Sequence, residues 1–181
     1  MDQFELRRLE AKKQAQQAAE RDRKNSVREK NVRFSPAPES CGRSSCTGLL
    51  ADRGSRLVAV VCHPWGPLGG SMHDITVSKI IDQLGMSAGL STLRFNFRSG
   101  LGRGHGSAAD VRGACAFVMQ TAAAAEQIVL IGYSYGASVV ASIAADIPEV
   151  AAFALIAPPL GANPCLFMCR SPITRRACPL L

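Results

Sequence analysis

The segment from Ile128 to Ala137, IVLIGYSYGA, constrains the fold more than any other part of the chain. Four apolar residues, typical of a buried strand, run into Gly-Tyr-Ser-Tyr-Gly at 132–136, and a helical pattern of small residues follows at once. This order predicts a strand, a sharp turn and a helix, with Ser134 at the turn. Such a turn forces the serine into a strained backbone conformation. It also brings strand and helix so close that only glycine fits two residues away on either side.

The predicted turn has the layout of an attacking serine. The hydroxyl of Ser134 would stand exposed above the end of a sheet, and the backbone N–H of Tyr135 would supply one half of an oxyanion hole. Gly132 and Gly136 would be the two close-contact glycines. A second interpretation stays open, because a Gly-x-Ser-x-Gly string is common: a glycine-rich turn whose serine has no chemical role.

Strands and helices alternate along the rest of the chain from residue 47 onward. Helices are expected to begin near residues 71, 107 and 135, and strands are expected at 47–51, 57–62, 92–97, 127–131 and 150–157. This alternation indicates βαβ units and an α/β fold, a three-layer sandwich around a mainly parallel sheet. In such sheets function gathers at the carboxyl ends of the strands, and the glycine-rich loops 63–70 and 98–106 leave those ends beside the serine turn.

The loop that starts His63-Pro64-Trp65 leaves the strand expected next to the serine strand. Its backbone could supply the second oxyanion donor, and the N–H of Trp65 is the most plausible one. The same loop also reads as a rigid Pro/Gly turn whose Trp65 packs over the sheet edge, and both can hold together. His63 could be a general base by residue type. We favour the alternative, a packed histidine that fixes its loop.

Composition and charge exclude several classes of protein. The net charge is +7, but no aromatic residues interleave with a basic stripe, so the sequence does not indicate nucleic-acid binding. No apolar run approaches the roughly 20 residues of a membrane span. The charged N-terminus lacks the apolar region of a secretory signal, and seven cysteines are an odd number, so we expect reduced thiols in a cytoplasmic protein. Cys62 and Cys115 fall on apolar faces and are expected to act as small hydrophobic residues.

Four regions are expected from the changes in composition along the chain. Residues 1–31 are rich in helix formers and predict a charged helical tail, which could also bind a protein partner. Residues 32–46 predict a flexible linker. Residues 47–162 form the α/β core, and residues 163–181 form a loosely packed tail.

Three segments, in this order, resemble the α/β-hydrolase superfamily. They are His63-Pro64 to Gly69-Gly70, Arg94-Phe-Asn-Phe-Arg98 and Gly132-Tyr-Ser-Tyr-Gly-Ala137. They look most like small members with little or no lid, such as dienelactone-hydrolase-like and Xaa-Pro-peptidase-like proteins, and the similarity runs from about Thr47 to Pro159. The resemblance implies hydrolysis of an ester, thioester or amide through an acyl-Ser134 intermediate. The N–H groups of Trp65 and Tyr135 would hold the oxyanion, with no metal or organic cofactor.

In this superfamily the catalytic triad follows the chain order serine, acid, histidine. No histidine follows Ser134, and Asp146 and Glu149 are the only later carboxylates, expected at a helix end on the wrong side of the sheet. We therefore expect a domain truncated at its C-terminus, weakly active or inactive, with an unpaired apolar sheet edge near Val150–Ala157. Two alternatives stay open: a non-catalytic binding module with this fold, and an acyltransferase on the same scaffold.

Overall fold

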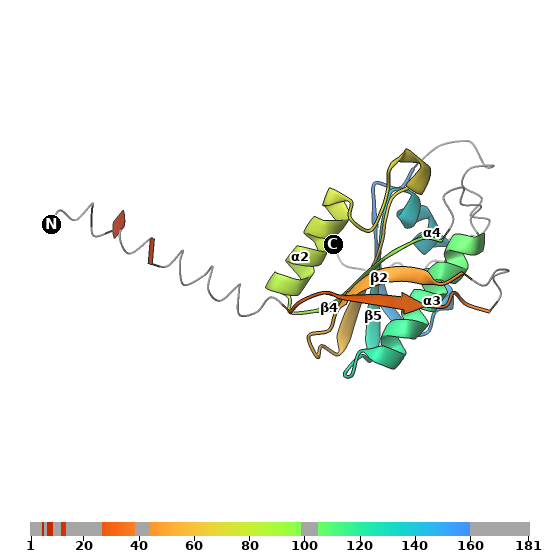
Figure 1. The fold of residues 1–181 in the computed structure, drawn as a ribbon, viewed down its shortest axis with the longest axis horizontal. Helices are drawn as coiled ribbons and strands as arrows, with labels where there is room; N and C mark the ends of the chain where they lie inside the picture. Colours follow the sequence, from red (N-terminus) through yellow and green to blue (C-terminus); the bar gives the residue numbers. More distant parts are fainter. Residues whose placement is uncertain are drawn as a thin grey trace.

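A six-stranded sheet forms the centre of the computed structural model, which describes residues 27–38, 44–98 and 105–159 together with Glu5, Arg7, Arg8, Lys12 and Lys13 (Figure 1). These five positions near the N-terminus are helical, in agreement with the helix-forming composition around them. In chain order the elements are β1 (Lys30–Phe34), β2 (Cys46–Ala51), β3 (Leu57–Cys62), η1 (Gly66–Leu68), α2 (Ile75–Ser87), β4 (Ser91–Asn96), α3 (His105–Thr121), β5 (Gln127–Tyr133), α4 (Tyr135–Ile143), η2 (Ala144–Asp146) and β6 (Val150–Ile156).

The strand order in the sheet is β1-β2-β4-β3-β5-β6. The first two strands are antiparallel, β2 is antiparallel to β4, and β4, β3, β5 and β6 run parallel to one another. The predicted three-layer α/β architecture with a mainly parallel sheet is therefore confirmed. Because β3, β4 and β5 are parallel neighbours, their carboxyl ends meet at one edge of the sheet, which brings the loop after β3 to the same edge as the turn after β5.

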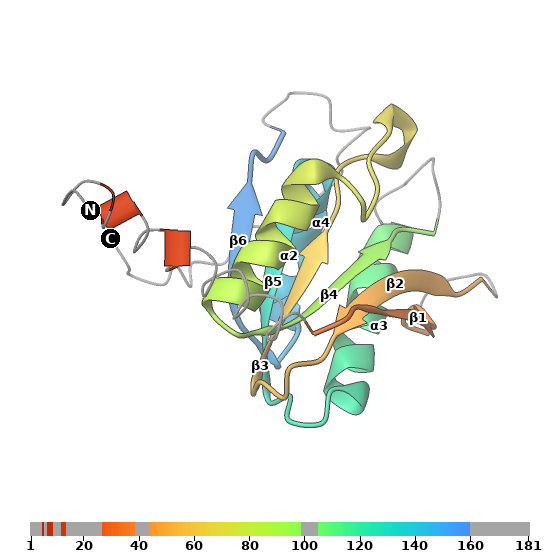
Figure 2. The same ribbon diagram turned by 60° about the vertical axis from the view of Figure 1, so that its left-hand side comes forward.

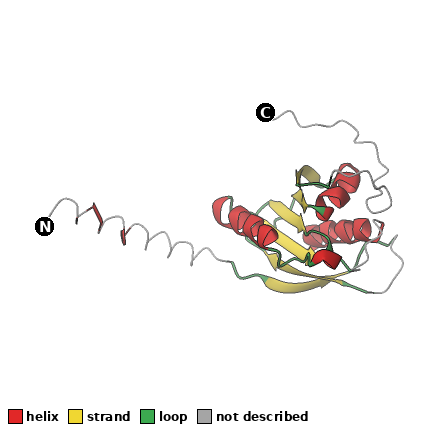
Figure 3. Ribbon diagram, turned by 90° about the horizontal axis from the view of Figure 1, so that it is seen from above, coloured by secondary structure: helices red, strands yellow, loops and turns green. Residues whose placement is uncertain are grey.

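Helices lie on both faces of the sheet (Figures 2 and 3), and the two faces carry very different cores. Helices α3 and α4 cover one face, where a cluster of twenty-one buried residues includes Leu93 and Phe95 of β4 and Val111 and Val118 of α3. Helix α2 covers the other face, where the buried cluster contains only Val61, Val77, Ile81 and Ile131 among the described residues. The alternation of side chains along each strand separates the two sets.

Strand β1 corrects the prediction of a helical tail to residue 31 and a flexible linker from residue 32. The run KNVRF places Val32 and Phe34 on one face of a strand that pairs with β2, and Phe34 packs on Phe95 and Phe117 with ring centroids 5.6 and 5.3 Å apart. The chain then stays docked on α3, because Ala37 N–H donates to the carbonyl of Ala109 at 2.9 Å. The alternation in KNVRF was the sequence signal, and it is short enough to be missed.

Helix boundaries differ from expectation by a few residues. Helix α3 begins at His105 rather than near residue 107, and the buried carboxylate of its Asp110 accepts bonds from Arg98. Helix α2 begins at Ile75 rather than near residue 71 and ends at Ser87, and Asp74 caps its start by accepting from Thr76 and Val77 N–H. Among the described residues, no helix combines the length and apolarity that crossing a bilayer requires.

Strand β6 ends the sheet and is paired only with β5 within the described residues. Its sequence VAAFALI is apolar throughout, yet positions 151–154 are exposed, and Phe153 retains 45% of its accessible surface. The expected unpaired apolar edge at Val150–Ala157 is therefore present in this part of the chain. Residues 160–181, and with them the predicted loose tail, lie outside the described residues.

Candidate active site at the serine turn

Ser134 occupies the turn between β5 and α4 in a backbone conformation that side chains rarely adopt. Its φ is 52° and its ψ is −115°, and of the described non-glycine residues only Ala157 shares a positive φ. The turn is held from both sides: Ser134 N–H donates to the carbonyl of Ile156 at 2.9 Å, and its carbonyl accepts from Ala137 N–H at 3.0 Å. Strain of this kind costs about 1–3 kcal/mol and persists only where the surroundings fix it.

The two glycines that flank Ser134 are required by backbone contacts. A Cβ on Gly132 would lie 2.5 Å from the Cα of Ala137, and a Cβ on Gly136 would lie 2.5 Å from the carbonyl oxygen of Cys62. Both obstacles are backbone atoms, which cannot rotate away. The predicted close passage of strand and helix at Gly132 and Gly136 is thus present in the structure.

The hydroxyl of Ser134 is not used to cap the helix that it precedes. A serine at this position ordinarily accepts a hydrogen bond from an N–H in the first turn of the helix. Here Ser134 is the residue before α4, but its side chain makes no such bond. The side chain is half-buried, so neither capping nor full burial accounts for a serine at this place.

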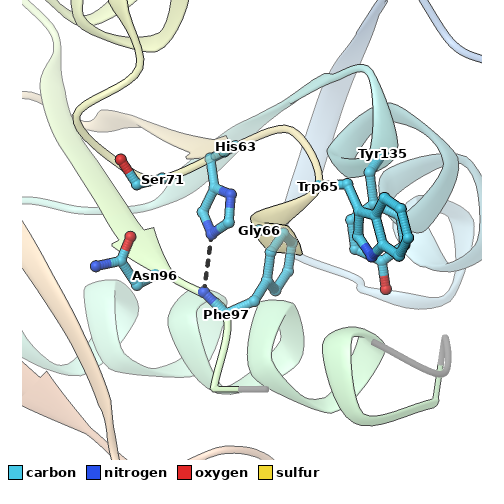
Figure 4. Close-up of a pocket in the computed structure, with 8 residues that line it drawn as sticks. His63, Trp65, Gly66, Ser71, Asn96, Phe97 and Tyr135 are labelled. Carbon is cyan, nitrogen blue, oxygen red and sulfur yellow. Dashed lines mark hydrogen bonds between the residues drawn. The ribbon is translucent and has the colours of Figure 1, made fainter. Parts of the chain in front are cut away.

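A pocket of about 300 Å³ opens at this edge of the sheet (Figure 4). The loop after β3, the end of β4 and the first residue of α4 line it; the residues are His63, Trp65, Gly66, Gly70, Ser71, Asn96, Phe97 and Tyr135. Ser134 is not one of the lining residues but precedes Tyr135, which is. None of the lining side chains is a carboxylate, a lysine or an arginine, so the pocket suits an uncharged group.

The loop after β3 folds back on Trp65. The carbonyl of Trp65 accepts from the N–H groups of Leu68 and Gly70 at 3.2 and 3.1 Å, which closes the short 3₁₀ turn η1. The indole is partly buried and packs against the large core. The structure therefore bears out the packing that the sequence suggested for Trp65, and it also brings this residue and Tyr135 to the same pocket.

Tyr135 fixes the start of α4. Its side chain is 4% exposed, its hydroxyl lies 2.8 Å from Ser107 Oγ of α3, and its ring meets that of Phe97 edge-on with centroids 5.7 Å apart. These contacts hold the first residue of the helix, whose backbone N–H is the predicted oxyanion donor. The side chain itself thus has a structural task beside the predicted task of the backbone.

His63 is a packed histidine, as favoured from the sequence. Phe97 N–H donates to its Nε2 at 3.1 Å, so Nε2 is an acceptor, and Nδ1 carries the proton that it donates to the carbonyl of Pro64 at 2.5 Å (Figure 4). Burial lowers the pKa of His63 below its ordinary value. With both ring nitrogens engaged in fixing the loop, this imidazole has no lone pair left to accept a proton from a nucleophile.

Three pocket residues were not singled out from the sequence: Ser71, Asn96 and Phe97. Figure 4 shows Ser71 and Asn96 on one side of His63 and Trp65 and Tyr135 on the other. Asn96 and Phe97 belong to the run RFNFR, which was read as a strand and as one of the three segments of the family resemblance, with no site role given to either residue. Their place at the carboxyl end of a parallel strand was the available signal, because such ends converge on the site.

The cysteines of the described residues have no role at this site. Cys46, Cys62 and Cys115 are free and buried, and desolvation raises the pKa of Cys46 and of Cys115 to about 12. Cys62 and Cys115 act as the small hydrophobic residues that the sequence predicted. Within residues 27–38, 44–98 and 105–159, no group of three or more histidine, cysteine or carboxylate side chains could hold a metal ion.

Comparison with solved structures agrees with the α/β fold. No protein-family model and no curated protein matches the chain. Among solved structures, it is similar to a lidless α/β serine hydrolase from Xanthomonas campestris, with 26% identity and a TM-score of 0.60 over 76% of this chain. An α/β serine hydrolase homologue from Coxiella burnetii shares 24% identity with a TM-score of 0.60 over 77% of this chain. An esterase from Pyrococcus furiosus shares 19% identity with a TM-score of 0.63 over 76% of it.

The chain spans only part of the length of these proteins. The matched region covers 64% of the Xanthomonas protein, 66% of the Coxiella protein and 54% of the Pyrococcus esterase. The likeness therefore concerns the fold of the part that they share.

Proposed function

We propose that this chain, whose fold is that of the α/β-hydrolase superfamily, carries the attacking serine of a hydrolase that acts on an ester, thioester or amide. The observation that carries the proposal is the backbone of Ser134, with φ at 52° in a turn that two glycines allow. A strained serine at the carboxyl edge of a parallel sheet, with its hydroxyl left out of helix capping, supports a nucleophile elbow.

The proposed reaction forms and breaks an acyl-serine bond. Ser134 Oγ attacks the carbonyl carbon of the substrate, and its proton passes through a base to the leaving alcohol, thiol or amine. The N–H groups of Tyr135 and Trp65 would hold the negative oxygen of the tetrahedral intermediate. Each such donor typically contributes about 10²–10³ in rate. Water then hydrolyses acyl-Ser134, releases the acid and restores the hydroxyl.

Whether Ser134 has a general base decides between an enzyme and a binding module. His63 supports the second candidate function, a non-catalytic module with a hydrolase fold, because it is the one histidine among the described residues that line the pocket and both of its ring nitrogens are engaged. A serine without its base keeps only the help of the oxyanion hole, about 10³–10⁴ over water. With His63 engaged in this way and no other described residue of the pocket able to act as the base, we expect slow acylation rather than rapid turnover.

A fluorophosphonate probe tests the proposal directly, because it reacts covalently with nucleophilic serines. We expect the intact mass of the protein to rise by one probe adduct and the adduct to map to Ser134. The Ser134→Ala variant should remain unlabelled. Ser142→Ala is the matched control, since Ser142 lies in α4, the helix that follows Ser134, with its hydroxyl donating to the carbonyl of Val139 at 2.6 Å; its labelling should equal that of the wild type.

Two results would count against the enzyme. Equal labelling of the wild type and Ser134→Ala would show that another residue reacts, which removes Ser134 from its role. No labelling of the wild type at high probe concentration and long incubation would favour the binding module.

A further inference from the structure

Arg94 makes four side-chain hydrogen bonds near the pocket. It lies in β4 with its side chain 13% exposed, on the strand face opposite to Leu93 and Phe95. Its Nε and Nη2 donate to the two carboxylate oxygens of Glu29 at 2.9 and 2.5 Å. This two-point pair joins the residue just before β1 to the middle of the sheet, and such forked pairs fix direction as well as charge.

The third nitrogen of Arg94 reaches across to the α2 layer. Nη1 donates to Ser78 Oγ of α2 at 2.8 Å and to the carbonyl oxygen of Met72 at 3.2 Å. Two residues further along β4, on the same face, Asn96 Oδ1 accepts from the N–H of Met72 at 2.8 Å. Both backbone polar groups of Met72 are therefore held by side chains of one strand.

Met72 is the point where the pocket loop is fastened. It directly follows the pocket-lining residues of loop 63–71, and its own side chain is buried at 8% exposure. At the other end the loop is fastened by His63, and in between it is closed on itself by the bond from Gly70 N–H to Trp65. A closed loop tied at two ends moves as a unit, so the bonds to Met72 also set the place of Trp65.

We propose that Arg94 is a positioning residue that holds the loop 63–72 in the geometry of the active site, and that Glu29 sets the direction of Arg94. The catalytic part of this inference rests on the proposed function, since it concerns the N–H of Trp65 as an oxyanion donor. The structural part, that Arg94 holds the loop 63–72 in place, is independent of the proposed function. A shift of the loop by about 1 Å is enough to cost on the order of 10²-fold in rate.

Trp65 supplies a readout that is independent of activity, because it is the only tryptophan in the chain. In Arg94→Met, which keeps the length of the side chain but removes its donors, we expect folded protein whose tryptophan emission shifts to the red and is quenched more readily by acrylamide. The rate at which fluorophosphonate labels Ser134 should fall by about 10- to 100-fold. Glu29→Gln should change the tryptophan emission, the quenching and the labelling rate in the same directions as Arg94→Met. The changes should be smaller, because the amide keeps one acceptor for Arg94.

The matched control is Arg56→Met, which removes an arginine from an ion pair with Glu126 whose side chains are 78% and 52% exposed. This variant should leave the Trp65 emission and the labelling rate unchanged. Circular dichroism at the assay temperature shows whether each variant is folded. If Arg94→Met does not fold, Ser78→Ala removes one of its partners alone, and the emission of Trp65 should then shift to the red by a smaller amount.

The outcomes separate this inference from the proposed function. Folded Arg94→Met with the emission, quenching and labelling of the wild type would overturn the positioning role. A shift in the Trp65 signals with no labelling of Ser134 in any variant would support the role of Arg94 in holding the loop while contradicting the hydrolase.

Discussion

The two faces of the sheet differ in how their buried residues interact: one by apolar packing and the other by side-chain hydrogen bonds. Beneath α3 and α4 the face is apolar, with twenty-one buried residues in one cluster. Beneath α2 only four of the described residues form a buried cluster. Further along β4 the space is taken by polar side chains, with Arg94 and Asn96 bound to Glu29, Ser78 and Met72. One face is built for burial, which is non-directional, and the other for hydrogen bonds, which fix positions.

This difference indicates a division of labour. The apolar face supplies most of the stability, because free energy from burial scales with the area removed from water. The polar face contributes less to stability but determines where the pocket loop lies. The serine turn stands at the edge where the two faces meet, with Gly136 of α4 against the backbone of β3.

The largest effect should come from a methyl group at this junction. In Gly136→Ala the new Cβ would lie 2.5 Å from the carbonyl oxygen of Cys62 and 2.8 Å from that of His63. Because both are backbone atoms, helix and strand must separate, and we expect a loss of more than about 4 kcal/mol in the free energy of unfolding. Urea unfolding followed by circular dichroism measures it.

Gly106→Ala is the matched control for this prediction. A Cβ at Gly106, in helix α3, meets nothing within 4 Å, so the same chemical change should stabilise the protein by roughly 0.5–1 kcal/mol. Equal stability of the two variants would contradict the conclusion that helix and strand pass too closely at the serine turn to admit a Cβ.

A second prediction, with a smaller expected effect, compares the stability lost when one buried residue on each face is truncated. Leu93 is fully buried in the large cluster, and Ile81 is 5% exposed in the small one. Truncation of such residues to alanine costs about 2–5 kcal/mol, and the cost grows with the cavity that stays unfilled. We expect Leu93→Ala near the upper end of this range and Ile81→Ala near the lower end, measured by urea unfolding. An equal or reversed order would contradict the division of labour between the faces.

The apolar face was the part of the fold that the sequence could predict. Valine-rich strands such as Leu57–Cys62 and the helical spacing of Val111, Ala114, Cys115 and Val118 carry their own periodicity, so the sheet and its helices follow from pattern alone. The serine turn was predictable for a related reason. Its two glycines and its serine lie within five consecutive residues, and the strain is local.

The polar face could not be predicted in the same way. Glu29 and Arg94 are 65 residues apart and Arg94 and Met72 are 22 apart, so no local pattern links them. On the α3 side of the sheet, Arg98 and Asp110 likewise form a pair in which both side chains are buried. Such pairs depend on the register of strands in space, which periodicity does not specify. Strand β1 was missed because its pattern is only five residues long.

The smallest predicted effect is a dependence of stability on pH, which we expect from His63 at the pocket and not from the residues of the apolar face. The cysteines on the apolar face are uncharged thiols at and below neutral pH, and burial raises their pKa further from that range. His63 differs, because burial lowers its pKa in the folded protein from the ordinary 6.5. Below that value the unfolded chain binds a proton that the folded chain does not. The contribution of His63 to the free energy of unfolding should therefore be fully present above pH 6.5, and it should decrease as the pH falls toward the pKa of the folded state.

Urea unfolding at a series of pH values between neutral and mildly acidic measures this slope. In His63→Gln the amide oxygen can still accept from Phe97 N–H, but the group no longer titrates, so part of the slope should disappear. The control is His73→Gln, which replaces an exposed histidine in the same loop region and should keep the slope of the wild type. A slope unchanged in His63→Gln would mean that the ring of His63 is not the neutral hydrogen-bonded acceptor that closes the pocket loop.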